Sequence, residues 1–295
     1  MPKSAAYIAI DWGTTNRRIF RMTADGDVLD TVRDDRGILA VRRDEYGREI
    51  DSIRSRHGAL PIIAAGMVGS TRGWIDIPYI SAPADAAALA GALAGAPAER
   101  VSIVPGIAFQ DAHRADVMRG EEVQVFGAIE SGQAPADALF CQPGTHNKWI
   151  ATHGARIVEF ATVLTGELFA LLKQHGILAG MLDGTVEDGR AFREGLARGA
   201  GATDLTVALF EVRAAVLLEK LAADDAAAFA SGLLIGADIG SRGDLAGRCV
   251  HLLATGSLAT LYASAIEWRG GTSVAIDSHA AFAAGIHKIW KLADD

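Results

Sequence analysis

The chain has 295 residues, half of them hydrophobic, which is enough to bury one large core or two medium ones, and two is the better expectation. Its net charge of -8 comes without any long basic run, which excludes a nucleic-acid or anionic-membrane surface from the expected partners. The two cysteines, Cys141 and Cys249, lack metal-ligand spacing, and no apolar run reaches membrane-spanning length, so we expect two buried thiols in a cytoplasmic protein.

Strand and helix signals alternate through the first half of the chain. Short apolar strands bounded by turn residues come first, and helices then alternate with further apolar strands. The expected elements are strands at 7–11, 18–23 and 28–33, a helix at 44–57, a strand at 60–65, a helix at 84–93 and a strand at 101–104. Up to residue 104 the predicted order is β-β-β-α-β-α-β.

The same order recurs downstream, around a helical insertion at about 180–245. The expected elements are strands at 138–142, 148–153 and 156–160, a helix at 165–174 and, after the insertion, a strand at 249–254, a helix at 258–268, a strand at 273–276 and a helix at 279–291. We therefore predict an α/β protein of two similar domains, residues 1–115 and 116–295, that flank a cleft.

The turn between the first two expected strands is a candidate phosphate site. The first strand ends in Asp11, and the small residues Gly13, Thr14 and Thr15 precede the second strand. Small side chains let backbone N–H groups and two hydroxyls approach an anion, and the adjacent carboxylate can hold a divalent cation through water. An ordinary hairpin, in which the aspartate only caps the turn, is the alternative interpretation.

A second turn of small residues, Gly144 and Thr145, falls at the equivalent place in the second half of the chain. It lies between the strands expected at 138–142 and 148–153. Two such turns, one in each domain, would grip a polyphosphate from both sides.

Six short strings, in order along the chain, resemble the 2-dehydro-3-deoxygalactonokinase family. They are Gly66–Ser70, Gly73-Trp74, Pro78-Tyr79, Asp116–Glu122, Pro143–Trp149 and Thr165–Phe169. Three further strings are similar to the first phosphate, second phosphate and adenosine motifs of the sugar kinase, Hsp70 and actin superfamily: Asp11-x-Gly13-Thr14-Thr15-x-x-Arg18, Gly144-Thr145 and Leu252–Ser257. The resemblance runs from Ile8 to the last helix and implies two RNase H-like domains of the actin-like ATPase type.

This resemblance implies phosphoryl transfer from ATP to the 6-hydroxyl of 2-dehydro-3-deoxy-D-galactonate, a step of galactonate catabolism. Such a transfer needs donors around the phosphates, Mg²⁺ and a carboxylate near the attacking hydroxyl. By resemblance Asp11 carries the magnesium, and the ATP and phosphate contacts come from Gly13, Thr14, Thr15, Arg18, Gly144, Thr145, Lys148, Gly256 and Ser257. Lys148 departs from the pattern of the wider superfamily, and a surface lysine on a strand is its alternative interpretation.

Two acidic residues are candidates for the catalytic carboxylate, which related carbohydrate kinases place near the start of the helix expected at 119–130. Asp116 is favoured by its place just before that helix, although an aspartate there is also the usual N-cap. Glu121 is favoured by its spacing to the second small-residue turn. Glu122 points about 100° away from Glu121 on a helix and is less suited. The sequence leaves the choice between Asp116 and Glu121 open.

The acceptor implied by the resemblance is a keto acid, so its carboxylate should meet a cation, and arginine binds carboxylates with two parallel hydrogen bonds. Arg17 and Arg119 are the candidates, together with Arg72, and a solvated surface arginine is the alternative for each. The acceptor pocket would be lined by Asn16, Met67, Gly69, Ser70 and Trp74. For Met67 and Trp74, packing in the core is an equally good interpretation.

Two other functions stay open at this point. One is a kinase for another keto-deoxy sugar acid, such as the gluconate epimer, because a single stereocentre cannot be deduced from the sequence. The other is a nucleotide-binding regulator or ATPase of the same superfamily without a small-molecule acceptor. The expected partners are ATP and a keto-deoxy sugar acid, and the oligomeric state is open, with a homodimer included.

Overall fold

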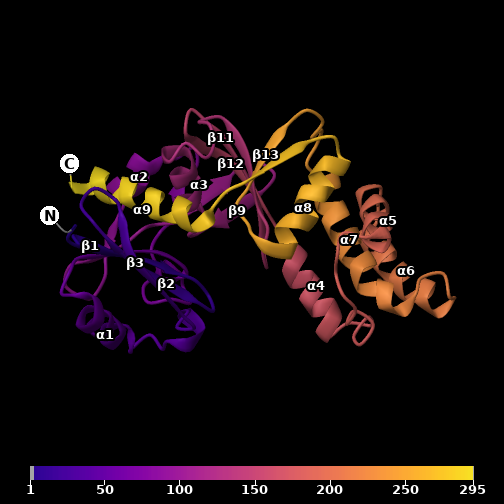
Figure 1. The fold of residues 1–295 in the computed structure, drawn as a ribbon, viewed down its shortest axis with the longest axis horizontal. Coiled ribbons are helices and arrows are strands. Elements are labelled where there is room, and N and C mark those ends of the chain that lie inside the picture. Colours follow the sequence, from indigo (N-terminus) through magenta and orange to yellow (C-terminus); the bar gives the residue numbers. More distant parts are fainter. Residues whose placement is uncertain (1–2, 295) are drawn as a thin grey trace. The chain divides into compact units, whose positions relative to one another are not determined.

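The computed structural model describes residues 3–294, which fall into two compact units (Figure 1). Unit 1 contains the chain up to Ala138, the segment Ile150–Phe160 and the chain from Asp277 onward. Unit 2 contains Leu139–Trp149 and Ala161–Ile276. None of the helices in residues 3–294 has the length and apolar character that a membrane crossing requires.

A six-stranded mixed sheet forms the centre of unit 1, in the order β3-β2-β1-β4-β7-β6. Its strands are β1 (Tyr7–Trp12), β2 (Arg17–Met22), β3 (Val28–Asp34), β4 (Ile62–Gly66), β6 (Ala94–Gly95) and β7 (Val101–Ile103). Strand β1 pairs antiparallel with β2 and parallel with β4, so it is a central strand and is buried almost throughout. This pairing places Asp11 opposite Arg18 on one side and beside Ala65 on the other.

Four helices and two short 3-10 turns accompany this sheet. They are η1 (Ile38–Ala40), α1 (Tyr46–His57), η2 (Met67–Gly69), α2 (Ala86–Gly91), α3 (Glu121–Glu130) and α9 (Ser278–Asp294). Helix α9, drawn in yellow, lies beside α2 and α3 although it ends the chain (Figure 1). Its contact with α3 is backbone to backbone, because a Cβ on Gly285 would lie 2.9 Å from the nitrogen of Gly127.

A three-stranded sheet, β5-β8-β9, leads into α3. Its strands are β5 (Ile80–Ser81), β8 (Ile107–Gln110) and β9 (Ala115–Met118). The expected helix at 119–130 therefore begins at Glu121, with Gly120 as its N-cap, and Asp116 lies in β9 opposite Phe109. The interpretation of Asp116 as an N-cap was wrong, because antiparallel pairing with β8 extends the strand to Met118.

The second large sheet has five strands in the order β12-β11-β10-β13-β14. They are β10 (Ala138–Gln142), β11 (Asn147–His153), β12 (Arg156–Val163), β13 (Cys249–Leu252) and β14 (Thr272–Ala275). Strands β10, β13 and β14 are parallel. Cys141 on β10 is buried as expected, but Cys249, the first residue of β13, is exposed, so the expectation of a buried thiol was wrong there. Both large sheets thus begin with three consecutive strands in reversed order. Strands β5, β6, β8 and β9 have no counterpart in the second half within residues 3–294, so the full list of elements differs between the halves, and the duplicated β-β-β-α-β-α-β order stays a prediction.

The helices of unit 2 include three in the region where an insertion was expected. They are α4 (Thr165–Gln174), α5 (Arg190–Ala200), α6 (Leu205–Leu217), η3 (Ala223–Asp225), α7 (Ala226–Gly240) and α8 (Gly256–Trp268). Helices α5 and α7 meet at glycines on both sides, since a Cβ on Gly232 would lie 2.9 Å from the nitrogen of Leu196. In the structure, helices α3 and α9 belong to unit 1, which contains the first large sheet. The expected boundary at 115/116 would instead place both helices in the same domain as the second large sheet. The division into domains stays a prediction.

Candidate active site

The turn between β1 and β2 directs its backbone carbonyl groups toward the segment Gly37–Leu39. Three hydrogen bonds join them: Ile38 N to Gly13 O (3.0 Å), Leu39 N to Thr14 O (3.1 Å) and Gly37 N to Thr15 O (3.3 Å). The N–H of a trans peptide points opposite to its carbonyl, so the amides of residues 14–16 point away from this segment. The side chains of residues 14–16 are exposed. Successive amides directed to one side form an anion-binding concavity.

Asp11 lies at the start of this turn, where its carboxylate is 19% exposed and 3.5 Å from the guanidinium of Arg18. Burial raises the pKa of Asp11, Arg18 opposes that rise, and the charge of Glu121 adds to it. Asp11 and Glu121 therefore interact electrostatically at one place in unit 1. The described residues contain no group of three or more acidic, histidine or cysteine side chains that could hold a metal on its own. A single carboxylate suits Mg²⁺ that is shared with phosphates and water.

Two glycines bring the start of α3 to this place. A Cβ on Gly120 would lie 3.1 Å from the Cα of Gly66, and a Cβ on Gly66 would lie 2.8 Å from the carbonyl oxygen of Trp12. Both glycines have positive φ, 107° and 96°. The end of β4 and the start of α3 therefore lie directly against the end of β1. The sequence reasoning used Gly66 and Gly120 only as parts of family strings, and neither was expected to bring Glu121 to Asp11.

The two candidate catalytic carboxylates have different surroundings. The carboxylate of Glu121 accepts a hydrogen bond from the amide of Arg119 at 3.0 Å, and its charge acts on Asp11. The carboxylate of Asp116 accepts the amide of Val117 at 2.7 Å from within β9. Neighbouring Glu122 is fully buried and accepts the Gly120 amide with both oxygens. Of these three carboxylates, Glu121 is the one whose charge raises the pKa of Asp11.

Arg17 and Arg119 are both buried, so the surface interpretation was wrong for each. Arg17 is 1% exposed and binds two carboxylates, Asp34 and Glu49. Arg119 is 6% exposed, donates from Nη2 to the carbonyl of Ile77 at 2.6 Å and stacks on the Tyr79 ring at 4.3 Å. Its Nε and Nη1 atoms have no hydrogen-bond partner among the described residues. Arg119 therefore has two free donor groups, whereas Arg17 is engaged on all three nitrogens.

The other residues expected to line the acceptor pocket divide into two groups. Asn16 is exposed at the turn, while Ser70 is buried and its hydroxyl donates to the carbonyl of Met67. Gly69 leaves room for Arg119, because a Cβ there would lie 3.0 Å from Nη1. Trp74 is 7% exposed and stacks on Tyr46 in the core of unit 1, and Met67 packs against the same core. Core packing thus describes both of these side chains. Arg72 is exposed.

In unit 2, the second small-residue turn packs against the start of α4. The Glu167 amide donates to the carbonyl of Thr145 at 2.9 Å, and a Cβ on Gly166 would lie 3.0 Å from the Cα of Thr145. His146 and Glu167 form a side-chain contact at 2.7 Å. Lys148 is buried, and its Nζ donates to the Thr162 hydroxyl at 2.6 Å, so the surface interpretation of this lysine was wrong.

A cavity of about 220 Å³ lies beside this turn, within unit 2. Gly144 and Ser257 line it together, so the structure unites two regions that the sequence could only propose separately. Most of its other walls are apolar, and they include Phe169, Leu234 and Tyr262. Gly256 begins α8 and has a φ of 75°. Apolar walls with a few polar groups at one end suit a flat heterocycle.

A buried aspartate on α7 connects the parts of unit 2 around this cavity. Asp238 accepts hydrogen bonds from Trp149 Nε1 at 3.0 Å, from the Tyr262 hydroxyl at 2.9 Å and from the Asn147 amide. Burial raises its pKa, while Arg242, 3.6 Å away, opposes the rise. Sequence reasoning missed Asp238. The available signal was one acid within the otherwise apolar run of α7.

The chain is similar to a defined set of known proteins. A family model described as 2-keto-3-deoxy-galactonokinase matches residues 11–289. One curated relative, from Rhizobium meliloti (strain 1021), carries the name 2-dehydro-3-deoxygalactonokinase DgoK1 and is 37% identical over 99% of this chain and 100% of its own length. Another is 2-dehydro-3-deoxygalactonokinase of Escherichia coli (strain K12), which is 35% identical over 97% of this chain and 98% of its own length.

Solved structures agree with these similarities. A crystal structure from Sinorhizobium meliloti that carries the same kinase name has a TM-score of 0.87, with 35% identity over 97% of this chain and 96% of that one. Component A of (R)-2-hydroxyglutaryl-CoA dehydratase from Acidaminococcus fermentans has a TM-score of 0.54 and 12% identity, with 99% and 100% covered, so its likeness concerns the fold alone. The fold is the mixed α/β fold of the sugar kinase and actin-like ATPase group.

Proposed function

The chain belongs to the 2-keto-3-deoxy-galactonokinase family, and we therefore propose that it phosphorylates 2-dehydro-3-deoxy-D-galactonate with ATP. The products are 2-dehydro-3-deoxy-6-phosphogalactonate and ADP, and the reaction belongs to galactonate catabolism. It is a carbohydrate kinase reaction, in which a phosphoryl group passes to an alcohol.

The observation that carries this proposal is the backbone of the turn at residues 13–16. Three carbonyl groups accept hydrogen bonds from Gly37–Leu39, so three amides point away from that segment, in a turn that follows Asp11 closely along the chain. An anion-binding turn next to a carboxylate is what a magnesium-bound phosphate requires. Arg18, opposite Asp11 on β2, adds a cation to the same place.

The residues of unit 1 would act on the transferred phosphoryl group and on the acceptor. Asp11 would hold Mg²⁺, which when bound would neutralise charge on the phosphate oxygens. Gly13, Thr14, Thr15 and Arg18 would bind the phosphoryl group. Glu121 would accept the proton of the 6-hydroxyl, with Asp116 as the second candidate. A strongly raised pKa is not required of this base, because proton transfer comes late in a loose transition state.

The acceptor contacts follow from the same part of unit 1. Arg119 would donate to the substrate carboxylate from Nη1, which has no partner, and Tyr79 would hold the guanidinium plane. The remaining expected acceptor residues are Asn16, Met67, Gly69, Ser70 and Trp74, of which Met67 and Trp74 would act through packing. Arg17 would not contact the acceptor, because Asp34 and Glu49 occupy all three of its guanidinium nitrogens.

The residues of unit 2 would bind the nucleotide. The cavity beside the second turn would hold the adenine, with Ser257 and Gly256 at the start of α8 and Gly144 at the turn. Thr145 and Lys148 would contact its phosphates. We further propose that the two large sheets mark two RNase H-like domains, residues 1–115 and 116–295, and that the reaction takes place in the cytoplasm, where ATP is available.

A coupled assay of ADP release tests the proposal. The purified protein is given ATP and Mg²⁺ with the galactonate compound or its gluconate epimer. We expect turnover of the galactonate form, its loss in Asp11→Ala, and its retention in Asp30→Ala on β3 of the same sheet. Turnover of both epimers would widen the acceptor to keto-deoxy acids in general. Absence of turnover with either, while ATP still binds, would exclude this function and favour a nucleotide-binding regulator.

A further inference from the structure

Arg17 begins β2 directly after the phosphate-binding turn, but its side chain points into unit 1. Its Nε and Nη2 bind the carboxylate of Asp34 at 3.1 and 2.7 Å, and its Nη1 binds Glu49 at 3.0 Å. The guanidinium also lies over the ring of Trp12, 4.8 Å from its centroid. A bidentate arginine with a third bond and an aromatic face has a single fixed position.

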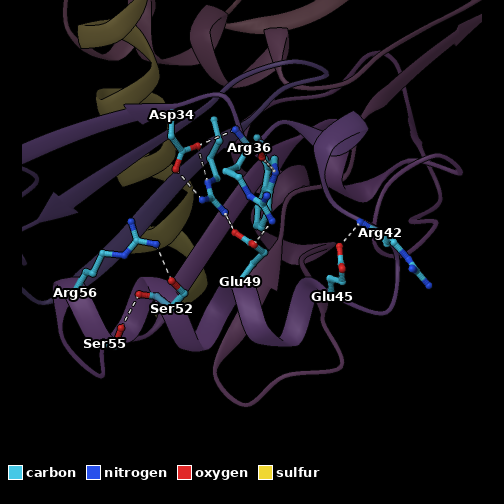
Figure 2. Close-up of polar contacts among 10 residues, drawn as sticks. Asp34, Arg36, Arg42, Glu45, Glu49, Ser52, Ser55 and Arg56 are labelled. Carbon is cyan, nitrogen blue, oxygen red and sulfur yellow. Dashed lines mark hydrogen bonds and ion pairs between the residues drawn. The ribbon is translucent and has the colours of Figure 1, made fainter.

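The same carboxylates hold the segment that follows β3. The amide of Arg36 donates to Asp34 Oδ1 at 3.1 Å, and the guanidinium of Arg36 binds Glu49. Figure 2 shows Asp34, Arg36 and Glu49 converging above α1. The indole of Trp12 donates to the carbonyl of Arg36 at 2.8 Å. Arg36 is therefore fixed from both its backbone and its side chain.

The next three residues, Gly37–Leu39, are the ones whose amides bind the carbonyl groups of the turn. Gly37 makes this contact possible, because a Cβ there would lie 2.6 Å from the nitrogen of Asn16 and closer still to the carbonyl of Thr14. Its φ is -64°, so the requirement for glycine comes from close approach and not from backbone strain. The turn thus rests on a backbone segment that Asp34 and Glu49 hold in place.

We propose that Arg17 is a positioning residue that, through Asp34, Glu49 and Gly37–Leu39, keeps the amides of the turn directed at the phosphate. It would touch neither ATP nor the acceptor, in contrast to the direct contact expected from the sequence. The inference rests on the proposed function in one respect, because it takes the ligand of the turn to be the transferred phosphoryl group of ATP.

The network balances two guanidinium groups with two carboxylates. Burial raises the pKa of Glu49, but the hydrogen bonds from Arg36 and Arg17 outweigh it and hold that pKa below its ordinary value. Removal of one partner from such a buried group leaves an uncompensated charge, so the neighbouring groups must move. The segment 34–39 is the part of the chain that such a movement would displace first, since Asp34 and Arg36 belong to it.

A matched pair of substitutions separates positioning from general stability. Asp34→Asn weakens the cross-strand pair with Arg17, whereas Asp30→Asn weakens the equivalent pair with Arg21, 2.7 Å apart on the same two strands. We expect Asp34→Asn to lower kcat/KM for ATP by about tenfold to a hundredfold, as small displacements of positioned groups do, with the KM of the keto acid unchanged. Asp30→Asn should lower it less than twofold. Equal kinetics of the two variants would overturn the proposal.

A second measurement does not depend on activity. Amide hydrogen exchange at residues 37–39 should become faster in Asp34→Asn than in the wild type and in Asp30→Asn, because these amides donate to the turn. If exchange is faster in Asp34→Asn but the wild-type protein does not phosphorylate the keto acid, the positioning role is retained and the proposed function is rejected. Unchanged exchange together with unchanged kinetics would reject the positioning role alone.

Gly37→Ala reaches the same contact without altering any charge, and it serves if Asp34→Asn does not fold. The added methyl group must push the segment away from the turn, so the loss of kcat/KM for ATP should be similar. Gly47→Ala is its control, because a Cβ on Gly47 meets no atom within 4 Å. A Gly37→Ala variant with the kinetics of Gly47→Ala would contradict the inference.

Discussion

Gly120 lies against Gly66, so closely that a Cβ on Gly120 would be 3.1 Å from the Cα of Gly66. Gly120 is the N-cap of α3, and Gly66 is the last residue of β4. Their contact brings the first residue of α3, Glu121, to the end of β1, where Asp11 lies. A helix that carries the proposed base is thus positioned by two residues that have no side chain.

We expect Gly120→Ala to lower kcat by at least about tenfold, because the methyl group separates α3 from β4 and moves Glu121. It should also destabilise the protein by about 1–2 kcal/mol, since φ is 107°. Gly132→Ala is the control, because Gly132 also has positive φ, 72°, but a Cβ there meets nothing within 4 Å. If both variants lose stability and keep kcat, the contact has no part in catalysis.

The choice between the two candidate bases can be decided by isosteric amides. Glu121→Gln removes the carboxylate whose charge acts on Asp11, and we expect kcat to fall by about a hundredfold or more. Asp116→Asn, in β9, should change kcat by less than about tenfold. Steady-state kinetics with saturating ATP and keto acid measure both. The reverse order of effects would assign the base to Asp116.

Elements with a long periodic pattern were predicted well from the sequence. Helix α4 and strand β10 have the same bounds as expected, because α4 carries apolar residues at helical spacing, β10 is a short continuous apolar run, and turn residues flank both. Strands β5 and β6 were missed, since two residues each carry no periodicity. Such short strands exist only through their pairing with other parts of the chain.

The site shows the same division between local and tertiary information. The turn after Asp11 was predicted because its small residues are consecutive. The role of Gly37 was not, since it becomes apparent only when a segment some twenty residues away lies on the turn. Neighbouring residues on a strand face opposite sides, so Arg17 and Arg18 cannot both point at one ligand. The structure places Arg18 beside Asp11 and Arg17 in the interior.

Arg119 offers two unpartnered donors, so its replacement should affect the acceptor and not the nucleotide. We expect Arg119→Lys to raise the KM of the keto acid by about tenfold to a hundredfold, because a flexible lysine cannot replace the planar guanidinium that Tyr79 and Ile77 hold in place. The KM of ATP should stay within about twofold. Both constants come from the coupled assay with one substrate saturating.

A matched arginine in unit 1 provides the control. Arg114 lies over the ring of Phe109 at 4.3 Å and donates to the carbonyl of Phe160, as Arg119 lies over Tyr79 and donates to Ile77. Arg114→Lys makes the same chemical change outside the proposed acceptor site. If it raises the KM of the keto acid as much as Arg119→Lys does, the effect is structural and Arg119 does not bind the acceptor.

Complete burial of Glu122, together with the nearby charge of Glu121, raises the pKa of the Glu122 carboxyl group from 4.5 to about 8. A carboxyl group with a raised folded-state pKa holds its proton in the native protein and loses it in the unfolded chain between these two values. Its contribution to stability is therefore fully present below pH 4.5, declines as pH rises and is lost above pH 8. Each pKa unit corresponds to about 1.4 kcal/mol, so the total reaches at most about 5 kcal/mol.

Glu122→Gln keeps the shape of the side chain and an acceptor for the Gly120 amide, but it cannot ionise. We expect its free energy of unfolding, measured with urea, to be close to that of the wild type at pH 5 and higher by about 1–3 kcal/mol at pH 9. Glu130→Gln, at the exposed end of the same helix, controls for the substitution itself. A difference between Glu122→Gln and wild type that is constant from pH 5 to pH 9 would mean that Glu122 does not keep its proton in the folded protein.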